Sequence, residues 1–206
     1  MKRTVAFLAG MAALSVTSAA SAATIAGTGS PSSVISGGTV EGFDSTASGL
    51  YASNTFGNVT ISGIGDPYTI GTAYNGQYNN SGGQSLYNDF DYSPISFRFD
   101  FATAVSAFAF NWGAADFNWT LSAFDAANNL LESFVLTPTY SSNAGEFYGI
   151  AAAGIQYATL WTDTGDYVFI DNFTSTTVAP VPLPAGLPLL MAALGGLALV
   201  NRKRRS

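Results

Sequence analysis

Apolar side chains in the middle of this chain recur at every second position. In ISFRFDF (95–101) three phenylalanines share one side, and in VSAFAFNW (105–112) two phenylalanines and a tryptophan do the same. A period of two places alternate side chains on opposite faces of a β-strand, whereas a helix needs a period near 3.6. The alternation therefore predicts an all-β fold in which one face of each strand is buried.

Similar segments follow one another along the chain, separated by turns rich in Gly, Asn, Asp and Ser. Strands are predicted at 118–124, 130–136, 155–162 and 167–173, with weaker candidates at 39–45, 49–53 and 57–63. Such a series predicts an antiparallel two-sheet sandwich, with jelly-roll connections because the strongest strands come late in the chain. The buried residues are expected to include Phe99, Phe110, Leu121, Val135, Leu160 and Ile170.

Charge is distributed very unevenly. Residues 24–180 hold one basic residue, Arg98, against all thirteen acidic residues of the chain, a formal charge of −12. A domain this acidic repels nucleic acid and anionic lipid headgroups. Nucleic acid is therefore excluded as a partner, and the acidic excess suits a soluble exported domain.

The chain contains no cysteine and no histidine. Disulfides, zinc sites built on these residues, and Ser-His-Asp or Cys-His nucleophile systems are all excluded. Glycoside hydrolysis needs two carboxylates about 5 to 10 Å apart, and the spacing of the acidic residues singles out no such pair. We expect a protein that is not an enzyme.

The N-terminus has the three parts of a secretory signal. Lys2 and Arg3 precede the apolar run 5–16, and Ala20 and Ala22 supply the small-x-small pattern at which signal peptidase cuts. A buried N-terminal helix is the alternative. The pattern predicts a signal peptide at 1–22 that uses the Sec machinery, a flexible linker at 23–38, and the sandwich domain at 39–175.

The C-terminus ends in an apolar stretch and a basic cluster. Prolines 182, 184 and 188 interrupt any strand, and the run 187–200, or 183–200 at its longest, is apolar. A bilayer needs about 20 such residues, which the longer count approaches. The sequence therefore predicts a linker at 176–186 and, at 187–206, a transmembrane helix with a cytoplasmic basic tail. A plain anchor is one interpretation.

The residues VPLPAGLPLL, a Gly/Ala/Leu-rich helix and RKRR resemble, in that order, the VPLPA-CTERM variant of the PEP-CTERM sorting signals of Gram-negative bacteria. The resemblance implies that an exosortase, a membrane transpeptidase, cuts near the motif and sends the body to the cell surface or the extracellular matrix. It assigns a sorting motif to Val181, Pro182, Leu183, Pro184, Ala185 and Gly186, and a retention cluster to Arg202, Lys203, Arg204 and Arg205. The chain lacks a Pro-Glu-Pro core, which points to a distinct variant of the enzyme.

The segments FRFDFATAVSAFAFNWG and FIDNF resemble β-sandwich domains that precede such tails. Two function classes stay open for the body. The first is a passive envelope or exopolysaccharide-associated component, and the alternative is a lectin-like carbohydrate-binding module.

A carbohydrate site would draw on aromatic rings in two segments. Trp112 and Trp119 could form a stacking platform, or they could belong to the core. Tyr78 lies in the irregular segment 74–92 with three more tyrosines, and that segment is either a binding loop or a solvated one.

Calcium is the one cofactor that the sequence suggests. Glu41, Asp44 and Asp171 would converge if the first and last strands were neighbours, and calcium takes several oxygen ligands from separate loops. The alternative is that these are ordinary surface carboxylates.

Overall fold

The computed structural model describes residues 22–88 and 95–177. This part of the chain contains twelve strands and one short 3-10 turn, η1 (Pro31–Ser33). The strands are β1 (Ala23–Thr28), β2 (Thr39–Glu41), β3 (Gly49–Tyr51), β4 (Ser53–Phe56), β5 (Val59–Gly63), β6 (Tyr68–Gly71), β7 (Ser85–Tyr87), β8 (Ser96–Gly113), β9 (Trp119–Phe124), β10 (Leu130–Leu136), β11 (Glu146–Trp161) and β12 (Phe169–Thr176). The predicted sorting motif, transmembrane segment, retention cluster and most of the signal peptide lie outside the described residues.

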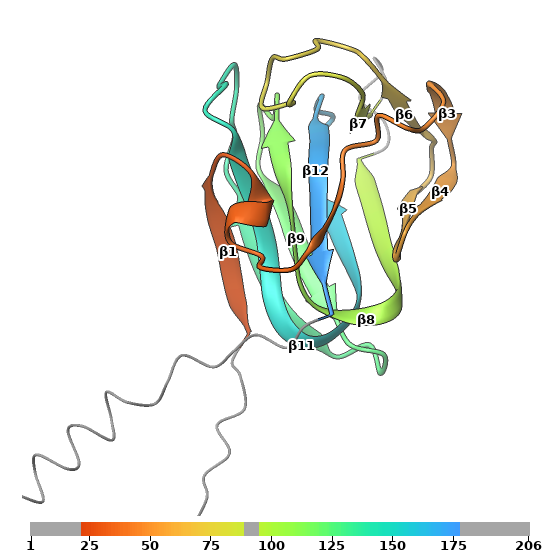
Figure 1. Cartoon of the computed structure of the whole chain (residues 1–206), viewed down its shortest axis with the longest axis vertical. Helices are drawn as coiled ribbons and strands as arrows, with labels where there is room; N and C mark the ends of the chain where they lie inside the picture. Colours follow the sequence, from red (N-terminus) through yellow and green to blue (C-terminus); the bar gives the residue numbers. More distant parts are fainter. Residues whose placement is uncertain (1–21, 89–94, 178–206) are drawn as a thin grey trace, which may run out of the picture.

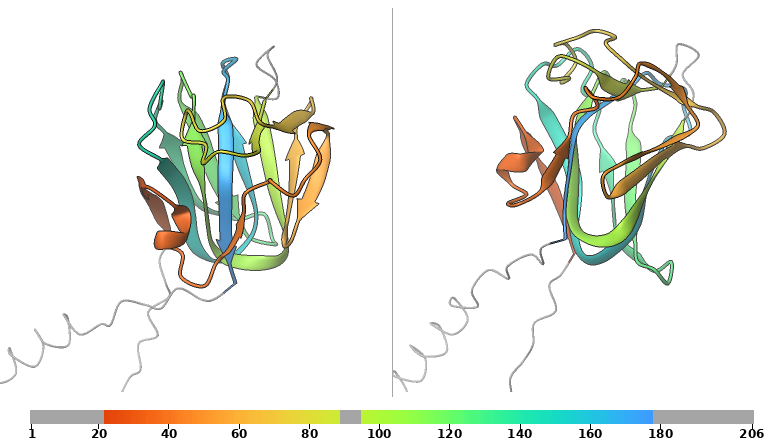
Figure 2. Two further views of the ribbon diagram at one scale, coloured as in Figure 1. Left: turned by 45° about the horizontal axis from the view of Figure 1, so that its top comes forward. Right: turned by 45° about the vertical axis from the view of Figure 1, so that its right-hand side comes forward.

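Two long strands, β8 and β11, run antiparallel through both layers of the molecule. Each curves at the same end of the molecule and continues into the opposite layer (Figure 2). Their register shifts between Ala151 and Ile155, where Gly154 has a positive φ of 77°. A residue without a Cβ tolerates this backbone conformation, which lets β11 turn from one layer into the other.

The first layer is built on residues 96–101 of β8 and 157–161 of β11, with β5 and β4 on one side and β9 and β10 on the other. The second layer is built on residues 105–113 of β8 and 147–151 of β11. It continues through β12, β7, β6 and β3 on one side and ends at β1 on the other. Every pairing is antiparallel, and the two layers face one another (Figures 1 and 2). The predicted all-β antiparallel sandwich is confirmed.

Aromatic side chains fill the space between the layers. The ring of Phe173 is central, with its centroid 5.3 Å from that of Phe99 and 6.0 Å from that of Phe110. Phe101 and Phe108 complete the group around it. All five rings are buried, so the period-two pattern correctly predicted the inward face of β8.

One predicted core residue is wrong. Val135 in β10 is 51% exposed, whereas its neighbour Leu136 is fully buried. β10 is an edge strand that pairs only with β9. Because side chains alternate along the strand, the burial of Leu136 turns Val135 towards solvent.

The predicted linker at 23–38 is also wrong, because these residues belong to the folded domain. β1 pairs with residues 146–151 of β11, and η1 follows it. The alternation in ATIAGT is weak because β1 lies at the sheet edge, with five of its six residues exposed. β2 pairs with β12, so the expected neighbourhood of the first predicted strand and the last one is confirmed.

β1 begins and β12 ends at the same end of the sandwich (Figure 1). No helix in residues 22–88 and 95–177 is long and apolar enough to cross a membrane. The loops that precede β7 and follow β10 lie at the other end of the molecule.

The core account predicts opposite outcomes for two truncations. Replacing Phe173 with Ala removes the ring on which four others pack and should lower the free energy of unfolding by about 3–5 kcal/mol. The matched change Val135→Ala truncates an exposed side chain and should stay within about 0.5 kcal/mol. Urea unfolding followed by near-ultraviolet circular dichroism measures both. A cost at Val135 equal to that at Phe173 would contradict this account.

Candidate functional site

The segment between β6 and β7 folds over the end of the sandwich that lies opposite the start of β1 and the end of β12 (Figure 1). Asn79 fixes it there: its side-chain amide donates to the carbonyl oxygen of Trp112 at 2.7 Å and accepts from the N–H of Gly145 at 2.7 Å. Asn143 accepts from the N–H of Tyr78 at 2.6 Å. The segment 74–92 was predicted as either a binding loop or a solvated one, and its residues 74–84 form an ordered cap over this end of the sandwich.

Gly113 permits this close approach. A Cβ atom on Gly113 would lie 1.5 Å from the carbonyl oxygen of Tyr78. No side chain fits there, because backbone atoms of the cap occupy the space. The glycine at the end of β8 therefore determines how closely the cap can dock.

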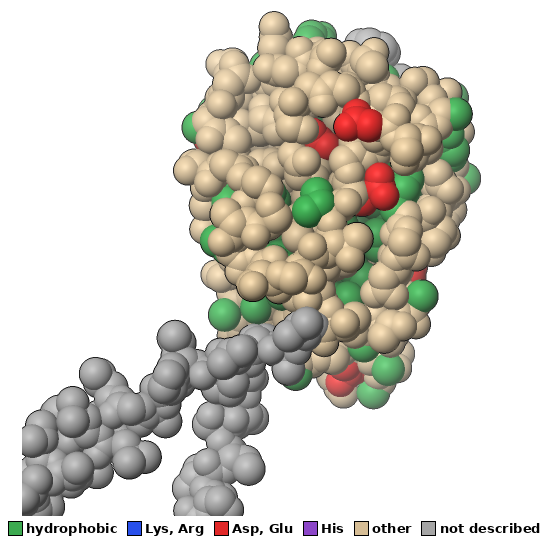
Figure 3. Space-filling model, viewed as in Figure 1, with side chains coloured by type: hydrophobic (Ala, Val, Ile, Leu, Met, Phe, Trp, Pro, Cys, Tyr) green, Lys and Arg blue, Asp and Glu red, His purple; other side chains and the backbone are tan. Residues whose placement is uncertain are grey.

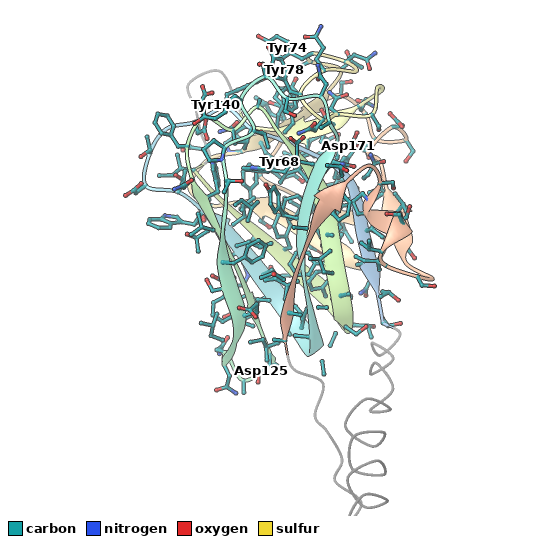
Figure 4. All side chains as sticks on the ribbon, turned by 90° about the vertical axis from the view of Figure 1, so that its left-hand side faces the viewer. Tyr68, Tyr74, Tyr78, Asp125, Tyr140 and Asp171 are labelled. Atoms are coloured by element: carbon teal, nitrogen blue, oxygen red, sulfur yellow. The ribbon has the colours of Figure 1, made fainter. Side chains whose placement is uncertain are left out.

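The cap and three neighbouring loops, those that follow β8, β10 and β11, line a pocket of about 380 Å³. We call it the tyrosine pocket. It is lined by Tyr74, Tyr78, Ala114, Asp116, Tyr140, Ser141 and Tyr167. Figure 4 shows Tyr74, Tyr78 and Tyr140 at one end of the molecule, with Asp125 at the other.

Phe169, the first residue of β12, supports the pocket from beneath. It is buried, and the ring of Tyr78 stacks parallel to it at 6.3 Å, while that of Tyr167 meets it edge-on at 5.2 Å. Tyr74 meets Tyr78 nearly at right angles, with 5.3 Å between centroids. The pocket walls are thus held by ring contacts to one another and to a core residue.

Four of the seven lining residues have a left-handed backbone: Tyr74 (φ 49°), Tyr78 (φ 55°), Ala114 (φ 63°) and Tyr140 (φ 50°). Residues with a Cβ rarely adopt this conformation, which costs about 1 kcal/mol or more each. Such strain persists where the surroundings enforce it, and it clusters at functional sites. Its concentration here favours the tyrosine pocket as the functional site.

Tyr140 combines a fixed backbone with a free ring. Its N–H and that of Thr139 both donate to the carbonyl oxygen of Ala115 at 2.9 Å. The side chain is nevertheless 61% exposed. The ring is therefore positioned by its backbone and remains available to a ligand.

The carboxylate of Asp166 holds the floor of the pocket together. One oxygen accepts from the N–H groups of Asp116 (3.0 Å) and Tyr167 (2.9 Å), and the other accepts from the N–H of Phe117 (3.2 Å) and the indole of Trp119 (2.8 Å). Asp166 itself is 2% exposed. Four donors compensate for the desolvation of its charge and fix two pocket residues relative to one another.

The tyrosine pocket contains one carboxylate, Asp116, and no basic residue. Arg98, the one basic residue in the described part of the chain, pairs with Asp100 at 2.8 Å and lies over the ring of Tyr157 at 3.9 Å. On the face seen in Figure 3, acidic side chains are visible in the upper half and again at the lower end, and no basic side chain is visible among the described residues.

The predicted tryptophan platform is wrong. Trp112 and Trp119 are both fully buried, with their rings edge to face at 5.5 Å, so neither can stack on a ligand. They lie beneath the pocket instead, since Trp119 donates to Asp166 and Trp112 accepts from the cap through its carbonyl oxygen.

Tyr78, the third predicted stacking residue, does line the pocket, as does Tyr74. Tyr87 lies against Phe169 and Tyr167, and Tyr92 lies outside the described residues. Asp116, Tyr140 and Tyr167 were not predicted as site residues from the sequence. Asp116 and Tyr140 lie in polar segments beside predicted strands, and Tyr167 is the first residue of the predicted strand 167–173.

A smaller hollow of about 280 Å³ lies beside the tyrosine pocket and is lined mainly by asparagine and glycine. Its amides largely bond to one another and to the backbone: Asn172 donates to Asn111, which donates to the carbonyl oxygen of Gly29. These bonds make the hollow part of the scaffold that joins the loops.

The three acidic residues proposed for calcium have protein partners. Asp171 accepts from the N–H and hydroxyl of Ser81, Asp44 accepts from the N–H of Gln84, and Glu41 accepts from that of Phe43. The described part of the chain contains no group of three or more acidic residues placed to hold a metal ion. Calcium binding at these residues stays a prediction.

No protein-family model matches the chain, and no curated protein matches it. Among solved structures, the chain is similar to TmCBM61 in complex with beta-1,4-galactotriose, at 18% identity and a TM-score of 0.35 over 66% of this chain and 94% of that one. It is also similar to the CBM22-1-CBM22-2 tandem domain from Paenibacillus barcinonensis Xyn10C, at 14% identity and a TM-score of 0.37 over 72% of this chain and 47% of that one. A third is the Clostridium thermocellum xylanase Xyn10B CBM22-1-GH10 modules complexed with xylohexaose, at 12% identity and a TM-score of 0.35 over 68% and 29%. Likeness at this level assigns no ligand to the chain.

Burial raises the pKa of Asp171, and the nearby charge of Asp44 raises it further, while the hydrogen bonds from Ser81 lower it. Because the net shift is upward, the native protein binds this proton more tightly than the unfolded chain does. The contribution of Asp171 to the free energy of unfolding is therefore complete below the unfolded pKa of about 3.9. It is lost as the pH rises through the higher pKa of the folded state.

The upward shift in the pKa of Asp171 predicts the effect of Asp171→Asn, which replaces the titrating carboxyl with a neutral amide. The stability of the wild type relative to this variant should fall as the pH rises from about 4 to about 7. Asp125 is the matched control, because hydrogen bonds from Asn129 lower its pKa. The stability of the wild type relative to Asp125→Asn should instead rise over that range. Urea unfolding at several pH values measures both differences, and equal slopes would contradict the account.

Proposed function

We propose that this protein is an exported, non-catalytic component of the cell surface or extracellular matrix whose sandwich binds polysaccharide in the tyrosine pocket. The observation that carries the proposal is the pocket itself: four tyrosines and a carboxylate, presented on strained and well-anchored loops. Its volume of about 380 Å³ lies in the range of roughly 300–1,000 Å³ that is usual for small-molecule sites.

A carbohydrate fits this combination of groups. A sugar ring presents C–H groups on its faces and hydroxyls around its rim, while a tyrosine presents an apolar face and a polar tip. Tyr74 and Tyr140 are 48% and 61% exposed, so a ligand can reach their rings. Asp116 supplies an acceptor for sugar hydroxyls.

The position of the pocket suits a domain held by its C-terminus. β12 ends at Thr176 on the end of the sandwich opposite the pocket, and the proposed sorting motif begins at Val181. The signal peptide would direct export through the Sec machinery, and an exosortase would act on the motif while the apolar helix remains in the inner membrane. The pocket would then face away from the point of attachment.

A passive structural role is the second candidate. The burial of Trp112 and Trp119 favours this role, because these two tryptophans belong to the core and cannot contact a ligand. The two candidates differ in whether the tyrosine pocket binds sugars, and a binding measurement decides between them.

Tyr140→Gly should separate binding from stability. Glycine adopts the left-handed conformation without strain, which offsets its greater freedom in the unfolded chain, so the free energy of unfolding should change by less than about 1 kcal/mol. Loss of the ring should weaken oligosaccharide binding by about ten-fold. Isothermal titration with a panel of neutral, amino and acidic oligosaccharides, together with urea unfolding, measures both.

Asn128→Gly provides the matched control. Asn128 also has a left-handed backbone, with φ 63°, but it lies in the turn between β9 and β10. Its substitution should leave binding unchanged. Equal affinities for wild type and Tyr140→Gly, or no binding of any oligosaccharide by the wild type, would contradict the proposed site.

The sorting proposal predicts that processing requires the prolines of the motif. Replacing Pro182 and Pro184 with Ala leaves the apolarity of the helix intact, so a plain anchor would hold both forms in the membrane. A sorting substrate should lose its last 20 or so residues in the wild type and accumulate uncut in the variant. Deleting residues 202–205 should also impair processing, because the positive cluster holds the tail in the cytoplasm.

Immunoblotting of fractionated cells provides the readout, with one epitope in the body and another after Arg205, in a strain that has the matching transpeptidase. Separation of the two epitopes supports sorting. If both epitopes stay on one membrane-bound wild-type chain, the segment is only an anchor.

A further inference from the structure

The tyrosine pocket carries negative charge in addition to its aromatic walls. We infer that it selects sugar residues that carry a free ammonium group, so that the preferred ligand is a polysaccharide of non-acetylated amino sugars. This inference rests on the proposed polysaccharide binding and specifies its ligand.

The walls of the pocket are suited to a cation. Tyr74 lies nearly perpendicular to both Tyr78 and Tyr167, at interplanar angles of 84° and 73° and centroid distances of 5.3 and 6.1 Å. At these distances the three rings pack edge to face on one another, so an ammonium would lie against the exposed ring surfaces rather than between the rings, and Tyr74 is 48% exposed. The face of an aromatic ring is electronegative and attracts an ammonium within about 6 Å. Because Tyr78 and Tyr167 are packed against Tyr74, the accessible rings of this aromatic enclosure are those of Tyr74 and Tyr140, and both can contact an amine at its mouth.

Asp116 adds a formal negative charge to the enclosure. Its backbone N–H is fixed by Asp166 at 3.0 Å, while its carboxylate makes no hydrogen bond or ion pair within residues 22–88 and 95–177. The side chain is exposed and lines the pocket. A carboxylate that is positioned but unpaired can accept hydrogen bonds from a ligand ammonium without giving up a protein partner.

The surrounding charges act in the same direction. Residues 24–180 have a formal charge of −12, and the one basic residue in that span, Arg98, is already paired with Asp100 and lines no part of the pocket. An anionic chain such as a polyuronate would be repelled and would find no basic group in the pocket. A cationic chain would be attracted, and an uncharged one would experience neither effect.

Three oligosaccharides of equal length test the inference: β-1,4-linked glucosamine, its N-acetylated form, and galacturonate. We would titrate each into the full chain in a mild neutral detergent and measure the dissociation constant by calorimetry. Glucosamine oligomers should bind about ten-fold more tightly than the acetylated ones, because acetylation removes the ammonium. Galacturonate should bind most weakly, and raising the salt concentration should weaken only glucosamine binding.

Asp116→Asn should reduce the affinity for glucosamine oligomers by about five-fold and leave that for the acetylated oligomers unchanged. Asp125→Asn removes one acidic charge from the opposite end of the molecule and should change neither affinity. Unfolding temperatures of both variants close to that of the wild type would confirm that the comparison concerns binding rather than folding.

The outcomes separate the two levels of the proposal. If acetylated or acidic oligomers bind as tightly as glucosamine, and Tyr140→Gly weakens that binding by about ten-fold, the pocket binds sugars but the inferred charge selection is wrong. If no oligosaccharide binds, the proposed function itself is wrong.

Discussion

The hydrogen-bonded pair of β8 and β11 is the feature on which the rest of the structure depends. Each strand runs through both layers, so the spacing and alignment of the two layers are set by continuous backbone rather than by loops. Bending at one end leaves the other end open, and there the cap meets the segments that follow β8, β10 and β11. At the opposite end, β8 and β11 curve from one layer into the other. The tyrosine pocket lies at the open end, where loops connect the strands.

Polar contacts then join four separate loops into one site. Asp166 gathers four N–H donors beneath the pocket, and Asn79 ties the cap to β8 and to Gly145. Bonds of their own backbone N–H groups, to Asn143 and to the carbonyl oxygen of Ala115, help to hold Tyr78 and Tyr140 in left-handed conformations. The left-handed residues therefore mark a place where a less stable backbone positions side chains that are not part of the core.

The fold class was predictable from the sequence because the period of two is a property of the strands themselves. Phe99, Phe110 and Ile170 were correctly placed in the core, where inward residues are large and outward ones polar. The first half of β11 was not predicted because the residues of GIAAAG, apart from Ile150, are all Gly or Ala and show no alternation of large apolar and polar side chains. β1 was not predicted because the residues of this edge strand are mostly exposed and show no apolar alternation. Val135 was misplaced because both Val135 and Leu136 are apolar, and only the phase of the strand distinguishes them.

The site was predictable only in part, since its residues come from four segments that are distant in sequence. Composition singled out the tyrosine-rich cap, and two of its tyrosines do line the pocket. Trp112 and Trp119 were wrongly predicted to bind a ligand because the sequence does not show whether a neighbouring loop covers a ring near the end of a strand. Asp116 and Tyr140 could not be linked to the cap without the pairing that brings their loops together.

Nuclear magnetic resonance mapping tests most directly the claim that the capped end is the binding surface. Backbone amide shifts of the isotope-labelled protein would be followed during titration with glucosamine oligomers. The account predicts the largest changes at Tyr74, Tyr78, Asp116 and Tyr140. The main competing surface is the outer face of the first layer, where Trp161 is 49% exposed and the rings of Phe124 and Tyr157 stack at 4.7 Å. Changes centred on Trp161 and Tyr157, with the pocket residues unmoved, would contradict it.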